Sequence, residues 1–358
     1  MSTRLLDPAQ QPDAIAQAAQ RLADGGLLAL PTETVYGLGA RADDDAAVAR
    51  IFAAKGRPSD HPLIVHVPNE AAALHFVSAF PPVAQRLVAA FWPGPLTVIV
   101  PRHPGMARAA AGGHDTIGLR CPDHPVARQL LDACAQLDIL GVAAPSANRF
   151  GRISPTRAAH VIDEFHDQAS LDPQGLDEVW VLDGGACAVG IESTIVDCSR
   201  GQPVLLRPGR LTLAELEAAA GEPLRWSRPE APDPLAPKAS GTLVSHYAPR
   251  ARVVLMDDGQ LARGLNVIEP ELVAQHLATP GVPPRVAVYS RSLWAHHPRH
   301  PGVVHVSMPG DAVTAAHDLF ADLRDMDATG VEQIWVEAPP AGPAWDGVRD
   351  RLARAAAA

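Results

Sequence analysis

Residues 27–40 read LLALPTETVYGLGA, and this stretch decides which fold we expect. The apolar run Leu27–Leu30 predicts a short buried strand. Thr32 and Thr34 flank Glu33 directly after that strand, and open α/β sheets place their ligand sites at strand ends. The glycines that follow would let a ligand approach the backbone closely. A ligand site and a plain polar turn are therefore the two interpretations of this stretch.

A pair of cations follows in residues 53–58, which read AAKGRP. Lys55 is one of two lysines in the chain, and nearly all other positive charge comes from Arg. A compact ammonium beside the planar fork of Arg57 suits a polyphosphate. The alternative is a cation pair that stabilises the end of a helix, which is the commoner arrangement.

Strand and helix patterns extend outward from this stretch over the first 220 residues. Strands are predicted at 62–67, 96–101, 116–121, 139–144, 179–182, 191–197 and 204–206, and helices at 13–24, 44–54, 125–136 and 213–220. This mixture predicts an α/β domain over residues 1–220.

The composition changes after that domain, and a second domain follows. Residues 222–241 read EPLRWSRPEAPDPLAPKASG, whose five prolines predict a semi-rigid linker over residues 221–250. Beyond it, strand patterns at 253–256, 286–289, 303–306 and 334–337 alternate with helical patterns at 270–277, 312–323 and 346–355. This alternation predicts a small parallel-sheet domain over residues 251–358.

Arg120 raises a question of charge. It lies in TIGLRC, where a strand would carry its guanidinium to the same face as Thr116 and Gly118. A cation in an apolar strand needs an anionic partner, and no acid is adjacent in sequence. A ligand carboxylate and a distant Asp or Glu of the protein are equally suitable.

Other polar residues follow or end buried runs. They are His66, Ser146, Ser154, Ser193 and Arg207. A lone strand histidine is more often structural than functional, and Ser154-Pro155-Thr156 also reads as the start of a helix.

Length and composition exclude several classes of protein. The 358 residues are 47% hydrophobic and 20% charged, which fits a folded chain of two domains. The four cysteines have neither zinc-ligand nor CxxC spacing, so we expect buried free thiols and no metal site. The net charge of −10 argues against long-range attraction to nucleic acid.

Several motifs are absent from the sequence. No apolar run approaches the roughly 20 residues that span a bilayer, and the N-terminus lacks a secretory signal, so we expect a cytoplasmic protein with no membrane partner. There is no GxxxxGK[ST], GxGxxG or GxSxG motif.

Taken together, eight segments resemble the threonylcarbamoyl-AMP synthases in sequence and in order. They are PTETVYGLGA, AKGRPSDHPLIVHV, FWPGPLTVIV, TIGLRCPDHPVA, APSANRFGRISPT, GIESTIVD, LLRPGRL and SHYAP. The resemblance spans about residues 25–249. It implies the long form of the family, in which a YrdC-like catalytic domain with a twisted mixed sheet precedes a smaller Rossmann-like domain.

The resemblance also implies a reaction. L-threonine, bicarbonate and ATP would give L-threonylcarbamoyl-AMP and diphosphate, which is a nucleotidyl transfer. ATP would enter as substrate and carry Mg2+. The product would serve the threonylcarbamoyladenosine modification of tRNA beside the anticodon, with tRNA threonylcarbamoyltransferase proteins downstream and tRNA itself as a candidate partner.

Site residues are carried over position by position from the same resemblance. The threonine contacts would be Thr34, His66, Arg120, Ala144 and Ser193. The ATP contacts would be Arg57, His61, Thr116, Ser146, Ser154 and Arg207. Lys55 and Arg57 would be the catalytic cations on the departing diphosphate, and the anion that Arg120 needs would be the carboxylate of threonine.

The chain departs from the family pattern at two places. His61 stands where many relatives have Asn, and it can still donate one hydrogen bond. The linker reads Ser240-Gly241-Thr242 where relatives commonly have Pro-Gly-Met, and Val244 stands where they commonly have Tyr or His, so the ATP contact of that side chain is not carried over. Ser245-His246-Tyr247 would still cover the site as a lid.

Two rival functions make different demands on the sequence. An RNA-binding module without catalysis would need surplus positive charge and exposed aromatic residues, both of which are scarce here. A carbamoyl-transfer enzyme of the hydrogenase-maturation type would carry zinc-finger cysteines and an acylphosphatase domain, and neither is present in the sequence.

Overall fold

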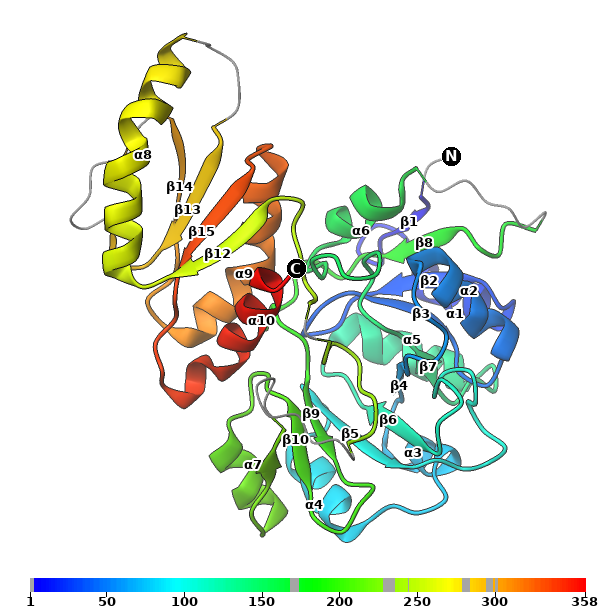
Figure 1. Cartoon of the computed structure of the whole chain (residues 1–358). Helices are drawn as coiled ribbons and strands as arrows, with labels where there is room; N and C mark the ends of the chain where they lie inside the picture. The colour runs from blue at the N-terminus through cyan, green and yellow to red at the C-terminus, as the bar shows by residue number, and fades with distance from the viewer. Residues whose placement is uncertain are drawn as a thin grey trace. The chain divides into compact units, whose positions relative to one another are not determined.

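The computed structural model describes residues 3–167, 174–227, 236–243, 245–278, 284–293, 299 and 302–358, apart from the side chains of residues 269 and 275–277. The chain divides into two compact units, drawn in Figure 1. Unit 1 comprises Met1–Phe150 and Ser154–Thr242, and unit 2 comprises Gly151–Ile153 and Leu243–Ala358.

Unit 1 is built on a mixed sheet that has eleven strands among the described residues. The strand order is β1-β8-β2-β3-β7-β4-β6-β5-β9-β10-β11. The strands are β1 (Leu5–Leu6), β2 (Leu27–Leu30), β3 (Gly37–Arg41), β4 (Ile64–His66), β5 (Leu96–Pro101), β6 (Thr116–Arg120), β7 (Val142–Ala143), β8 (Val179–Leu182), β9 (Thr194–Asp197), β10 (Val204–Arg207) and β11 (Arg225–Trp226).

Helices cover both faces of this sheet. They are α1 (Ala14–Ala23), α2 (Asp45–Lys55), α3 (Glu70–Ala73), α4 (Pro82–Phe91), α5 (Pro125–Ala135), α6 (Ala158–Phe165) and α7 (Leu213–Ala220), with a 3-10 turn at Leu74–Phe76. Strand β2 shows why its sequence is apolar throughout. Leu27 and Ala29 join the core beneath α2, whereas Leu28 and Leu30 join the core formed with α1 and α5. A strand buried on both faces needs a continuous apolar run.

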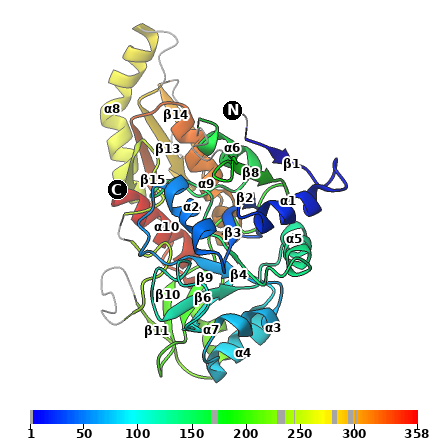
Figure 2. The same ribbon diagram turned by 90° about the vertical axis from the view of Figure 1, so that its right-hand side faces the viewer.

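Unit 2 is a four-stranded parallel sheet in the order β12-β15-β13-β14. The strands are β12 (Arg252–Met256), β13 (Val286–Ser290), β14 (Val303–Ser307) and β15 (Gln333–Glu337). Its helices are α8 (Asp258–Ala278), α9 (Ala312–Ala328) and α10 (Asp346–Ala356), with a 3-10 turn at Pro343–Trp345. Figures 1 and 2 show α8 on one face of this sheet and α9 with α10 on the other. The mixed sheet and the separate parallel sheet confirm the predicted fold class.

Two predicted elements differ from the structure. Residues 37–41, for which no strand was predicted, form β3. A Cβ at Gly39 would lie 2.8 Å from Leu30 and 2.9 Å from Val142, so strand packing requires the glycine. Helix α8 begins at Asp258, twelve residues before the predicted start, and Pro270 lies inside it.

Further differences concern short elements. The segment Ser154–Thr156 precedes a helix without starting it, because α6 begins at Ala158. Helix α4 was not predicted. All four cysteines are free and buried, as expected. Along the described parts of the chain, no helix has the length and apolar character needed to cross a membrane.

Candidate active site

Arg120, at the end of β6, lies at the centre of a buried polar cluster. Its Nη1 donates to Oγ1 of Thr34 at 2.8 Å, and its Nη2 lies 2.7 Å from Oε1 of Glu33. Oγ1 of Thr34 is 2.8 Å from Oγ1 of Thr32, and the backbone N–H of Asp123 donates to the second oxygen of Glu33. The turn after β2 thus supplies both the hydroxyl and the acid that face Arg120.

This geometry answers the question of charge that the sequence left open. The resemblance implied that the anion Arg120 needs is the carboxylate of threonine, whereas its anionic partner in the structure is a carboxylate of the protein, Glu33. The side chains of both residues are less than one tenth exposed. The contacts to Thr34, Glu33 and the Gly94 carbonyl, which accepts from Nε at 3.4 Å, involve three of the five N–H groups of the guanidinium, so Arg120 retains two donors for a second anion.

His66 ends β4 beside Arg120. The two residues are register partners in the parallel pair of β4 and β6, and His66 also pairs with Val142 of β7. Burial, reinforced by the positive charge of Arg120, lowers the pKa of His66 to about 3. The imidazole is therefore neutral at physiological pH, as required of a side chain that both donates and accepts hydrogen bonds.

Ser193 links this region to a second cation. Its Oγ is 2.8 Å from Oγ1 of Thr97 and accepts a bond from Nη2 of Arg207 at 3.1 Å. Arg207 also donates through Nε to the Ser193 carbonyl and through Nη1 to the Ser240 carbonyl. The hydroxyls of Thr97 in β5 and of Ser193 before β9 are thus bonded to each other, and the guanidinium of Arg207 holds Ser193 in place.

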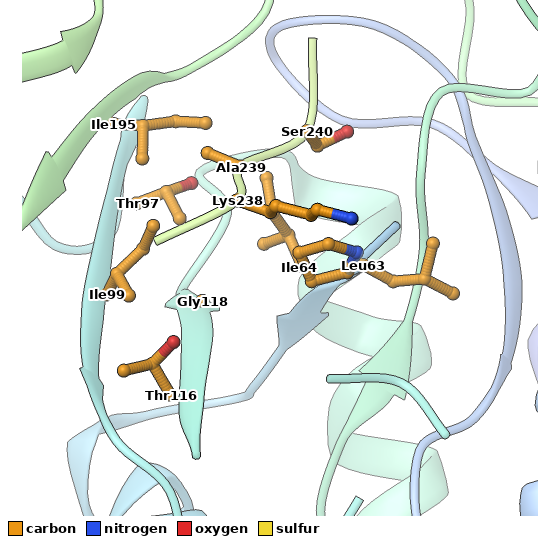
Figure 3. Close-up of a pocket in the computed structure, with 11 residues that line it drawn as sticks. Leu63, Ile64, Thr97, Ile99, Thr116, Gly118, Ile195, Lys238, Ala239 and Ser240 are labelled. Atoms are coloured by element: carbon orange, nitrogen blue, oxygen red, sulfur yellow. The ribbon is translucent and has the colours of Figure 1, made fainter. Parts of the chain in front are cut away.

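A pocket of about 290 Å3, partly open to solvent, lies next to this pair (Figure 3). Its walls come from β4, β5, β6 and β9 and from residues 238–240. The lining residues are Pro62, Leu63, Ile64, Thr97, Ile99, Thr116, Gly118, Ile195, Lys238, Ala239 and Ser240. The segment 238–240 passes over the strands, and Nζ of Lys238 lies 2.5 Å from Oδ2 of Asp60. Of the residues carried over by resemblance, Thr116 lines this pocket directly.

Lys55 is the last residue of α2, and its side chain is buried. Its Nζ donates to the carbonyl oxygen of Ser146 at 2.6 Å and to that of Asn148. Burial, followed by the nearby charge of Arg57, holds the pKa of Lys55 well below its ordinary value. In the structure the ammonium therefore anchors the 146–148 loop.

Arg57 and His61 lie on the chain just after α2. Nη2 of Arg57 donates to the Pro62 carbonyl at 3.1 Å. The ring of His61 packs edge-on against Phe150 at 5.6 Å between centroids. Burial, and then the charge of Arg57, lowers the pKa of His61. Arg57 therefore braces the residue that begins one wall of the pocket.

Ser154 and Ala144 are the last two of the site residues that the family resemblance implies. Oγ of Ser154 donates to Oε1 of Glu192, the residue before Ser193, and both side chains are buried. The N–H of Ala144 donates to the Ile64 carbonyl at 2.9 Å. A Cβ on Gly37 would lie 3.0 Å from Cβ of Ala144, so β3 and the 144–146 segment run in close contact.

The structure joins most of these residues through short hydrogen-bonded links, in three groups. Thr34 and Arg120 form one group, Ser193 and Arg207 a second, and Lys55 and Ser146 a third. His66 lies beside the first group as the register partner of Arg120. Glu192 connects Ser154 to the second group, since it immediately precedes Ser193. Within the described ranges, no three His, Cys, Asp or Glu side chains lie together as a metal site would require.

Two contacts in this region were not predicted from the sequence, those of Glu33 and of Thr97. Glu33 was identified only as a member of a motif, and its pairing with Arg120 depends on tertiary structure. Thr97 was treated as a strand residue, although a hydroxyl among the apolar residues of LTVIVP was a usable signal. Val244 lies outside the described residues. His246 and Tyr247, expected as a lid, are buried in unit 2, where Tyr247 packs on Phe320 at 5.4 Å.

Family comparisons cover both units. A sequence model for Sua5, YciO and YrdC proteins, described as "Telomere recombination", matches residues 20–209. A second model, described as "Threonylcarbamoyl-AMP synthase, C-terminal domain", matches residues 211–357.

Curated relatives and solved structures agree over nearly the whole chain. A threonylcarbamoyl-AMP synthase of Pyrococcus abyssi is 38% identical, with 89% of this chain and 87% of the relative aligned. One from Bacillus subtilis is 34% identical, with 96% and 92% aligned. The crystal structure of P. abyssi Sua5 complexed with L-threonine superposes with a TM-score of 0.83 at 33% identity, covering 99% of this chain and 98% of that one. The chain therefore belongs to the threonylcarbamoyl-AMP synthase family, in the long form with the family's C-terminal domain.

Proposed function

We propose that this protein is an L-threonylcarbamoyladenylate synthase, a nucleotidyltransferase that acts on L-threonine, bicarbonate and ATP. The observation that carries the proposal is the buried group of Arg120, Thr34 and His66 beside a pocket that Thr116 lines. Two other lining residues, Thr97 and Ser240, contact Ser193 and Arg207 respectively. Relatives that align over most of their own length are named threonylcarbamoyl-AMP synthases, and the similar structure of P. abyssi Sua5 was determined in complex with L-threonine.

The proposed chemistry has two steps. The amine of threonine attacks the carbon of bicarbonate, a C–N bond forms, and water leaves to give a carbamate. A carbamate oxygen then attacks the α-phosphorus of ATP, the bond between the α-phosphorus and the bridging oxygen breaks, and diphosphate departs. Holding three small reactants together supplies much of the acceleration of such a reaction.

On the threonine side, we assign contacts to Thr34, His66, Arg120, Ala144 and Ser193. The remaining donors of Arg120 are proposed to bind the threonine carboxylate while Glu33 holds the guanidinium in place. A neutral imidazole at His66 and a hydroxyl at Ser193 suit the polar groups of an amino acid, because each can donate or accept.

On the ATP side, we assign contacts to Arg57, His61, Thr116, Ser146, Ser154 and Arg207, with Lys55 and Arg57 nearest the departing diphosphate. Lys55 donates to two carbonyls, so its third N–H is the one proposed to reach phosphate. An approaching polyphosphate favours the charged ammonium, so it opposes the lowering of the pKa of Lys55 by burial. Mg2+ would arrive with ATP and share the stabilisation of the leaving group.

The product carries a mixed anhydride of a carbamate and a phosphate, which reacts readily with nucleophiles. A transferase must therefore consume it, and we propose the tRNA modification beside the anticodon as its destination, in the cytoplasm. Whether tRNA also docks on this chain is a separate question, and the net charge of −10 does not favour it.

The decisive experiment supplies pure protein with threonine, radiolabelled bicarbonate, ATP and Mg2+. We expect labelled threonylcarbamoyl-AMP, together with diphosphate release that depends on threonine. Diphosphate release that is independent of threonine, or the absence of any labelled adenylate, would contradict the proposal. Serine in place of threonine is the matched control, because it keeps every group except the methyl.

A further inference from the structure

Three residues between the 146–148 loop and the start of α6 belong to unit 2, although the residues on either side of them belong to unit 1. Residues before these three are held within unit 1, where the N–H of Phe150 donates to the Lys55 carbonyl at 2.8 Å. Residues after them are also held there, since the N–H of Tyr36 donates to the Pro155 carbonyl at 2.8 Å. The three residues between them, Gly151–Ile153, belong to unit 2.

Unit 2 holds this tripeptide at each of its residues. The N–H of Ala248 donates to the Gly151 carbonyl at 2.9 Å, and Arg152 pairs with Ala248 in a parallel bridge. Nη2 of Arg152 lies 3.6 Å from Oδ2 of Asp327. The guanidinium of Arg324 donates to the Ile153 carbonyl.

Arg324 and Asp327 both lie in the last two turns of α9, so one helix end supplies the side-chain contacts. Oδ1 of Asp327 also accepts a bond from the N–H of Ala251 at 2.8 Å, just before β12. The side chains that contact the tripeptide are therefore held by α9 and by the segment before β12, both of which belong to unit 2.

The contact at Ile153 bears directly on Ser154. The carbonyl of Ile153 and the N–H of Ser154 belong to the same peptide unit, which is planar and rigid. Ser154 is fully buried, and its hydroxyl donates to Glu192. A shift of the Ile153 carbonyl must therefore move Ser154 or break its bond to Glu192.

We propose that unit 2 sets the geometry of the ATP side through this tripeptide, with Arg324 as the positioning residue for Ser154. This inference rests on the proposed function, which places Ser154 against ATP. It gives the C-terminal unit a specific task within catalysis, namely to hold one peptide plane of the nucleotide subsite.

The test compares Arg324→Ala with Arg285→Ala in the full chain. Arg285 is the matched control, since it is an arginine of unit 2 whose partner Glu332 lies at an exposed site. Loss of a charged hydrogen bond is expected to raise the KM for ATP about tenfold or more in Arg324→Ala. The KM for threonine should stay within about twofold of the wild-type value.

Two further variants should change the KM for ATP by smaller amounts than Arg324→Ala does. Arg324→Lys keeps a cationic donor and should restore part of the affinity for ATP. Asp327→Asn keeps an acceptor for Ala251 but weakens the longer pair with Arg152, so its effect should be smaller than that of Arg324→Ala. Hydrogen exchange of the peptide 149–157 is the structural readout, and it should accelerate in Arg324→Ala but not in the control.

The outcomes separate this inference from the proposed function. Faster exchange with a raised ATP KM and an unchanged threonine KM supports the inference. An unchanged ATP KM, or equal increases in both KM values, overturns it. If the wild-type protein makes no threonylcarbamoyl-AMP, the proposed function fails, and ATP binding measured by calorimetry then decides whether Arg324 positions a nucleotide subsite.

Discussion

The two units each contain a pair of neighbouring parallel strands that end in polar residues. The hydrogen-bond partners of these polar side chains come from different sources in the two units. In unit 1, β4 and β6 end at His66 and Arg120. In unit 2, β13 and β15 end at Ser290 and Glu337. In open α/β sheets this edge is where ligands commonly bind.

The cluster in unit 2 is closed on itself. Glu337 accepts from Oγ of Ser290 at 2.6 Å, from the N–H of Arg291 at 2.7 Å and from the N–H of Ser292 at 3.0 Å. The guanidinium of Arg291 also donates to it. One tight turn therefore satisfies the carboxylate, which is what a structural anchor requires.

The cluster in unit 1 is assembled from distant segments. Arg120 meets Glu33 and Thr34 from the turn after β2, and His66 from β4. No single turn closes it, and the guanidinium retains donors. Both units have polar residues at strand ends, so these residues alone do not identify a ligand site. The difference lies in the hydrogen-bond partners, which come from one turn in the structural anchor and from distant segments in the candidate ligand site.

The largest effect is expected from breaking the open cluster. The double variant Arg120→Met with Glu33→Gln removes both charges together, so no buried charge is left unpaired. We expect the KM for threonine to rise about 10- to 100-fold, the equivalent of one charged hydrogen bond. Steady-state kinetics at saturating ATP measure it.

The control for this variant is its melting temperature. A small change in stability with a large change in threonine KM supports a direct contact with substrate. An unchanged KM in a folded double variant would assign Arg120 to structure alone.

A smaller, purely structural effect is expected from the closed cluster. Burial opposes ionisation, but hydrogen bonds from Ser290 and from the turn hold the pKa of Glu337 below its ordinary value. Its stabilisation is therefore present above the unfolded-state pKa and is lost as the pH falls through the folded one. Glu337→Gln should destabilise unit 2 by about 2 kcal/mol, measured by urea unfolding at neutral pH.

The same variant should leave the KM values for threonine and ATP unchanged. A large loss of substrate affinity with intact stability would mean that the edge of unit 2 also binds a substrate. That result would remove the distinction between the two clusters.

The smallest effect concerns His66 and pH. Its folded-state pKa of about 3 lies below the unfolded value of 6.5, so the unfolded chain takes up the proton first as the pH falls. Stability should drop by about 1 kcal/mol between pH 7 and pH 5.5 from this residue. His66→Gln should flatten that part of the pH profile in thermal or urea unfolding, and an unaltered profile would show that the pKa of His66 is the same in the folded and unfolded states.

Much of the fold could be predicted because its strands are apolar runs bounded by breaking residues. The bounds of β2, β5, β8 and α7 agree with the predicted ones. Strand β3 was missed because its glycines suggest a loop, whereas close strand packing excludes a Cβ there. The start of α8 was missed because Pro270 was taken as a boundary, and tertiary packing overrode that local preference.

The candidate site was less predictable from the residues alone. Composition and spacing indicated hydroxyls and cations at strand ends, and the resemblance selected among them. Neither indicated that Glu33 faces Arg120 or that Lys55 holds the 146–148 loop, because both contacts join segments far apart in sequence. The contacts of unit 2 with Gly151–Ile153 could not be predicted for the same reason.

The scarcity of lysine has a practical consequence for labelling. One of the two lysines, Lys55, is buried, whereas the side chain of Lys238 is about half exposed and lines the pocket. Of the two lysines, an amine-directed fluorophore will therefore react at Lys238. The unaltered protein thus offers an attachment point for a fluorescent reporter at the rim of its own pocket.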